Sequence, residues 1–95
     1  MTMITKEQSR AARGLLDWSQ DQLGQKANLS ESTIRDFEKG RRIPSVNNLA
    51  AIARAFEASG IIFIAENGEG PGVRLKKQKP DEGTRPQQLT SENDT

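Results

Sequence analysis

Residues 20–56 contain two short stretches of helical periodicity, a basic loop and a third helical stretch. In the first stretch, Leu23 and Ala27 lie four residues apart on one face, and Ser19 is a favourable N-cap. Asn28 follows directly, and Asn tolerates the left-handed conformation that ends a helix. The pattern predicts a helix from just after Ser19 to Ala27, with a sharp turn at Asn28.

A second short helix is expected directly after that turn. Ser30 is a strong N-cap for a helix from about Glu31 to Lys39, and Gly40 ends it. Ile34 and Phe37 lie three residues apart and face inward. Two short helices joined by so tight a turn predict a helix-turn-helix.

The outward face of the second helix carries short and long hydrogen-bonding side chains. In a helix-turn-helix, the second helix enters the major groove of DNA with its N-terminus first. We therefore expect this face to contact bases, with Arg35 able to reach either a base or a phosphate. The expected base-reading residues are Glu31, Ser32, Arg35 and Asp36. The alternative is an ordinary solvated helix face, because charged helix surfaces are common.

The run from Ser19 to Phe56 resembles the phage-repressor-like helix-turn-helix regulators of the xenobiotic-response-element (Cro/C1-type) family. The matching positions are Gln20, Leu23, Ala27, Ser30, Ile34, Glu38, Gly40, Pro44, Leu49, Ile52 and Ala53. The resemblance covers roughly residues 5–58. It implies a mainly α, four- to five-helix lambda-repressor-like DNA-binding domain, and an ion pair between Arg13 and Glu38.

The chain departs from the family pattern at two places. Asn28 stands where the family more often has Gly, and the acidic residues Glu31 and Asp36 occupy recognition positions that are frequently Gln, Arg or Ser. A carboxylate repels phosphate and prefers the amino group of cytosine. These departures leave the predicted fold unchanged, but they affect which operator sequence the chain is expected to prefer.

Basic residues gather where the second helix ends, although the net charge is only +1. We expect Lys39, Arg41 and Arg42 to contact phosphates, since such contacts set the register of a reading helix without specifying sequence. The alternative is a random surface cluster. The resemblance adds Gln20, and we also assign Thr33 to the phosphate-contacting group.

Two flanking helices are expected to form the scaffold. One runs from Lys6 to Trp18 after a Thr5 cap, and the other from about Val46 to Ala58. The apolar stripe of the first consists of Ala11, Ala12, Leu15 and Leu16, and that of the second of Leu49, Ile52, Ala53 and Phe56.

After Gly60 the pattern becomes extended. Two apolar or alternating runs, near 61–65 and 72–76, flank the turn sequence ENGEGPG and predict a β-hairpin. An isolated hairpin is marginal in water, so either the helical core or a second copy of the chain must cover it. We favour a homodimer, with the recognition helices about 34 Å apart. The expected dimer interface is Ile62, Ile64, Val73 and Leu75.

The chain therefore divides into a DNA-binding domain (1–60), a hairpin that mediates dimerisation (61–76) and a disordered tail (77–95), whose composition is too polar to fold alone. There is no cysteine and no histidine, which excludes disulfides, thiol nucleophiles and imidazole chemistry. We expect no catalytic residues, no metal and no cofactor. No apolar run approaches the roughly 20 residues that span a bilayer, and no signal peptide is visible, so a cytoplasmic location is expected.

These observations predict a sequence-specific DNA-binding transcriptional regulator, a homodimer on double-stranded DNA with a two-fold symmetric operator. A second hypothesis is an antitoxin or adaptor that keeps the helix-turn-helix fold while its hairpin or tail binds another protein. An enzyme is the least favoured class, because no catalytic constellation is present.

Overall fold

The computed structural model describes residues 3–77. This part contains α1 (Lys6–Leu16), α2 (Gln20–Ala27), α3 (Glu31–Glu38) and α4 (Val46–Ala58), followed by an antiparallel hairpin of β1 (Ile61–Ile64) and β2 (Gly72–Leu75). None of these helices is long and apolar enough to cross a membrane. The mainly helical fold with a C-terminal hairpin is confirmed, whereas the predicted tail lies outside the described residues except for Lys77.

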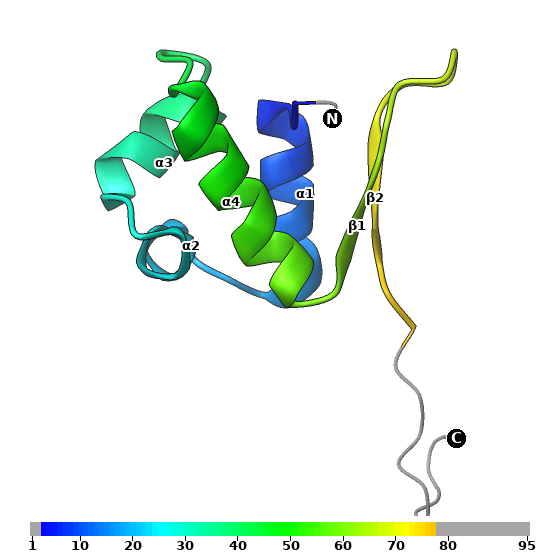
Figure 1. The fold of residues 1–95 in the computed structure, drawn as a ribbon, viewed down its shortest axis with the longest axis horizontal. Coiled ribbons are helices and arrows are strands. Elements are labelled where there is room, and N and C mark those ends of the chain that lie inside the picture. Colours follow the sequence, from blue (N-terminus) through cyan, green and yellow to red (C-terminus); the bar gives the residue numbers. More distant parts are fainter. Residues whose placement is uncertain (1–2, 78–95) are drawn as a thin grey trace, which may run out of the picture.

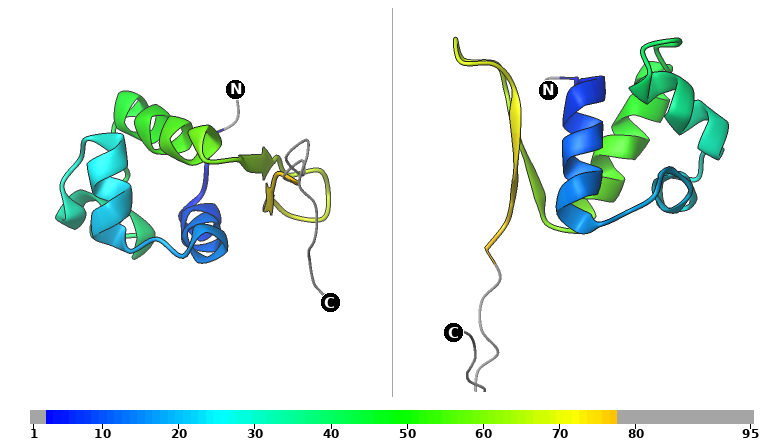
Figure 2. Two further views of the ribbon diagram at one scale, coloured as in Figure 1. Left: turned by 90° about the horizontal axis from the view of Figure 1, so that it is seen from below. Right: turned by 180° about the vertical axis from the view of Figure 1, so that it is seen from behind.

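The molecule is elongated, with α3 at one end and the hairpin at the other (Figures 1 and 2). Its longest dimension is 45 Å. The two elements for which the sequence predicts a function are therefore separated by the whole helical scaffold.

Each helix begins where a hydroxyl side chain satisfies a free backbone N–H group. Thr5, Ser19, Ser30 and Ser45 each accept a hydrogen bond from the backbone of the residue three positions later, at 3.0 to 3.2 Å. Asn28 adopts the left-handed conformation (φ 61°) that ends α2. The predicted boundaries of α2 are confirmed.

α1 ends at Leu16, two residues before the predicted end. Asp17 is left-handed (φ 59°), and the N–H of Trp18 turns back to the carbonyl of Arg13 at 3.0 Å, which closes the helix. Trp18 itself stacks on Phe56 with 5.6 Å between ring centroids and covers one edge of the core.

The predicted apolar stripe of α1 is wrong at Ala11 and Leu15, which are exposed. The other half of the stripe is confirmed, since Ala12 is buried and Leu16 packs partly buried against the core. The buried face also carries Gln8 and Ser9, which the stripe did not include. It is polar because α1 packs against hydrogen-bond acceptors: a carboxylate from α3 and backbone carbonyls from the hairpin. The predicted stripe of α4 is confirmed, since all four of its residues are buried.

The hairpin packs one face onto the helices. Ile61 is buried in the core, and Phe63 and Val73 pack against it. Phe63 also meets Phe56 edge to face, at 6.0 Å between ring centroids. Gln8 fixes the hairpin further, because its Nε2 donates to the carbonyls of Ile64 at 3.2 Å and Gly72 at 2.8 Å.

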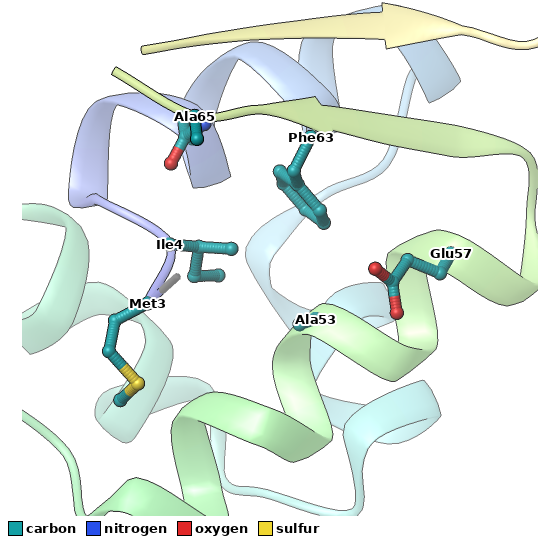
Figure 3. A pocket seen from close by; sticks show the side chains of 7 residues that line it. Met3, Ile4, Ala53, Glu57, Phe63 and Ala65 are labelled. Atoms are coloured by element: carbon teal, nitrogen blue, oxygen red, sulfur yellow. The ribbon is translucent and has the colours of Figure 1, made fainter. Parts of the chain in front are cut away.

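A small cavity of about 180 Å³ remains between β1, α4 and the segment before α1. Ile4 and Phe63 border it from opposite sides, and Glu57 lies at its edge (Figure 3). The hairpin is thus a packed part of the helical domain with a minor packing gap.

Candidate nucleic-acid interface

The tight turn between α2 and α3 depends on a glycine. The N–H of Leu29 donates to the carbonyl of Gly24 at 2.8 Å. A Cβ atom at Gly24 would lie 2.7 Å from the carbonyl oxygen of Leu29, closer than real Cβ contacts. Gly24 therefore allows the turn to fold back onto α2 and sets the angle at which α3 leaves it.

α3 buries one face and presents the other. Ile34 and Phe37 are buried against the core, as predicted. Glu31 and Ser32 are exposed, and Arg35 and Asp36 are half-buried. The structure places the four predicted base-reading residues on one helix, outside the core, where they can reach a ligand together.

The loop after α3 folds back onto that helix. The N–H groups of Arg41 and Arg42 both donate to the carbonyl of Asp36, at 2.8 and 3.3 Å. The guanidinium of Arg41 lies 3.9 Å from the Asp36 carboxylate, a loose and largely exposed pair. The loop thereby holds two cations beside the outward face of α3.

Glu38, the last residue of α3, joins three helices. Its side chain is 1% exposed and its oxygens accept hydrogen bonds from Ser9 of α1 at 2.6 Å, from Arg13 of α1 at 2.6 and 2.9 Å, and from Gln20 of α2 at 3.2 Å. The ion pair implied by the resemblance is confirmed. Ser9 was missed by the sequence analysis, because nothing in the sequence marks a buried serine as a partner of a distant carboxylate.

Two opposing effects act on the pKa of Glu38. Burial raises it, but hydrogen bonds from Arg13, Ser9 and Gln20, together with the positive charge of Arg13, outweigh burial. The pKa lies below its ordinary value, so Glu38 is a carboxylate at neutral pH. The network therefore fixes the end of α3 relative to α1 and α2.

Two of the three remaining residues that were predicted to contact phosphate, Gln20 and Thr33, have side-chain contacts within the protein. The side-chain amide nitrogen of Gln20 donates a hydrogen bond to Glu38. The same nitrogen carries a second hydrogen that can be donated to a phosphate. The hydroxyl of Thr33 lies 2.8 Å from that of Ser30, beside the N-terminus of α3. Lys39 directly follows α3 and is exposed.

The hairpin divides the four predicted interface residues between two faces. Residues directly opposite in an antiparallel pair share a face. Val73 pairs with Phe63 and Leu75 with Ile61, so both lie on the side of the helical core. The outer face carries Ile62 and Ile64, of which Ile62 is 41% exposed. The four do not form one surface, because this register places Val73 and Leu75 on the opposite face from Ile62 and Ile64.

Comparisons with known proteins agree with this geometry. Residues 10–61 match the family model described as helix-turn-helix. The solution NMR structure of the DNA-binding domain of the P22 C2 repressor is similar, with a TM-score of 0.53 and 29% identity over 60% of this chain and 76% of that chain. No curated protein matches the sequence significantly.

Proposed function

Because the chain belongs to the helix-turn-helix family, we propose that it acts as a homodimer whose two α3 helices read the halves of a two-fold symmetric operator. The family and the matched repressor domain make it a phage-repressor-like DNA-binding regulator. The observation that carries the reading role is the polar outward face of α3, a helix whose C-terminal end is fixed against α1 and α2 by the Glu38 network. We assign base contacts to Glu31, Ser32, Arg35 and Asp36.

Phosphate contacts are assigned to the residues that flank this face. Arg41 and Arg42 are tethered to the end of α3 through the Asp36 carbonyl, which holds their side chains close to a DNA strand that borders the groove. We expect Arg42→Ala to weaken binding to every duplex and to lower the salt dependence, since one fewer counterion is released. The measurement is the slope of log affinity against log salt concentration on a random-sequence duplex. An unchanged slope would contradict the assignment.

A second copy of the chain is the proposed cover for the outer face of the hairpin. Its apolar residues are Ile62 and Ile64. Its two ends carry opposite charges: Glu69 lies in the turn, and Lys76 and Lys77 lie at the open end. A two-fold axis perpendicular to the strands sets the acidic end of one copy against the basic end of the other. Opposite charges then meet at both ends, which favours this axis over a two-fold axis parallel to the strands, where like charges would meet.

Dimerisation is testable by sedimentation. We expect Ile62→Lys to give a folded monomer, whereas Leu15→Lys, an equally apolar and exposed position on α1, leaves the dimer intact. Glu69→Lys should weaken the dimer, and adding Lys76→Glu in the same chain should restore it. An Ile62→Lys variant that stays dimeric rules out the hairpin face.

The shape of the molecule changes the expected operator. α3 and the hairpin lie at opposite ends of the 45 Å dimension, so a dimer joined at the hairpins separates its α3 helices by more than one helical turn of about 34 Å. Half-sites two turns apart, about 68 Å between centres, fit this shape better than adjacent ones. Footprinting on the DNA upstream of its own gene tests this: two protected segments separated by one unprotected turn are expected, and one continuous short segment would contradict it.

A further inference from the structure

A basic crevice opens on the surface between α1, the start of α2 and the turn after α3. We use this name for the hollow lined by Lys6, Arg10 and Arg13 of α1, by Gln20, and by Glu38, Lys39 and Arg41. The three α1 residues follow the spacing i, i+4, i+7, which places them on one face of that helix. The crevice therefore joins a basic stripe on the scaffold to the basic loop beside the reading helix.

The positive charge of the crevice is largely uncompensated. Glu38 is its single acidic lining residue, and that carboxylate is already engaged by Arg13, at 2.6 Å, and by its other two donors. The other four cations have no acidic partner within the lining. Lys6 and Arg41 each have a carboxylate outside it only at 3.9 Å, in pairs that are too exposed and too long to neutralise them.

Two of these cations reach across from α1 to the end of α3. A guanidinium nitrogen of Arg10 donates to the backbone carbonyl of Glu38. The ammonium of Lys6 lies over Gly40, where a Cβ atom would meet it at 3.2 Å. Gly40 has φ 76° and no side chain, so Lys6 can approach the turn closely. α1 thereby places charge beside Lys39 and Arg41.

We propose that the basic crevice binds a backbone phosphate of duplex DNA, and that Lys6 and Arg10 are phosphate-contacting residues of the scaffold helix. The proposal rests on the proposed DNA-binding function. Arg10 uses one N–H group on the protein and keeps further donors of its planar fork for a phosphate oxygen, while Lys6 adds a point charge. The crevice is open and adjoins the loop of Arg41, which suits a phosphodiester strand running past it.

The test compares salt dependence on a random-sequence duplex. Lys6→Gln and Arg10→Gln are each expected to lower the slope of log affinity against log salt by about one, with equal loss on operator and random sequences. Arg10→Lys, which retains the charge, should keep most of the slope. Arg54→Gln on α4 removes one exposed charge outside the crevice and should leave the slope unchanged. Melting curves check that each variant is folded.

The outcomes separate the inference from the function on which it rests. If both α1 variants keep the wild-type slope while Arg42→Ala lowers it, the chain binds DNA without the crevice and the inference is overturned. If the wild-type protein binds no duplex, both the proposed function and this inference are overturned. If inorganic phosphate binds wild type but not Arg10→Gln, and a saturating duplex at constant ionic strength does not displace it, the crevice is a free-phosphate site and the DNA assignment is overturned.

Discussion

Replacing Glu38 by Ala is the perturbation with the largest expected effect on stability. The side chain is 1% exposed and receives hydrogen bonds from Ser9, Arg13 and Gln20. Removing one partner of a buried ion pair costs about 3 to 5 kcal/mol, because the other charge is left without compensation. The Arg13 side chain is 20% exposed, so water relieves part of this cost and we expect about 3 kcal/mol.

Thermal unfolding followed by circular dichroism measures this loss. For a domain of this size, about 3 kcal/mol corresponds to a fall in Tm of about 12 to 24 °C. Glu31→Ala is the matched control, since it removes the same side chain from an exposed position on the same helix and costs less than about 1 kcal/mol. Equal melting temperatures for the two variants would refute the reasoning.

The same pair predicts a pH dependence. The folded-state pKa of Glu38 lies below its ordinary value of 4.5. A lowered folded-state pKa means that the ionised pair contributes its full stability above about pH 4.5 and loses it as the pH falls through the folded-state pKa. The difference in Tm between wild type and Glu38→Gln should therefore be constant near neutral pH and shrink below pH 4.5. A difference that grows on acidification would contradict the assignment.

Replacing two helical glycines by Ala should change the stability of the fold in opposite directions. Gly14→Ala should stabilise the fold by about 1 kcal/mol, because nothing lies within 4 Å of the new Cβ atom. Gly24→Ala should destabilise it by about 1 to 3 kcal/mol, because the new Cβ atom would collide with the Leu29 carbonyl oxygen. Tm values of both variants decide this. Asn28→Ala should cost about 1 kcal/mol at φ 61°, whereas Asn28→Gly should cost clearly less. Gln8→Ala removes both donors to the hairpin carbonyls, so amide exchange in β1 and β2 should accelerate more than in α4; uniform exchange would argue against a specific anchor.

The helix-turn-helix could be predicted closely because its signals are local. Ser19 and Asn28 bound α2, and Ser30 starts α3, each through a hydrogen bond or a backbone conformation that the residue type itself favours. Such signals depend on neighbours within four residues. They are present in the sequence before any tertiary contact forms.

The buried face of α1 could not be predicted in the same way. Gln8 and Ser9 are polar, and helical periodicity favours apolar residues such as Leu15 for the core. Their burial is favourable only because Glu38 and the hairpin carbonyls, which are distant in sequence, accept their hydrogen bonds. Contacts with residues distant in sequence therefore decided which face of α1 is buried, and the apolar periodicity of α1 did not.

The hairpin and the basic crevice were also predictable from the sequence only in part. The strands were predictable, but their inward face was not, because Ile62 and Phe63 are both apolar and alternation carries no information there. The spacing of Lys6 and Arg10 was visible in the sequence. Their closeness to Lys39 required the fold.

The most direct test of the account is the selection of binding sites from a randomised duplex pool. Wild type is expected to enrich one site, and a variant with Ser32→Ala and Asp36→Asn should enrich a site that differs at a few bases, since each good base contact contributes about 1 to 3 kcal/mol of discrimination. Arg42→Ala should bind more weakly but enrich the wild-type site. A Ser32 and Asp36 variant that enriches the wild-type sequence unchanged would contradict the claim that α3 reads the operator.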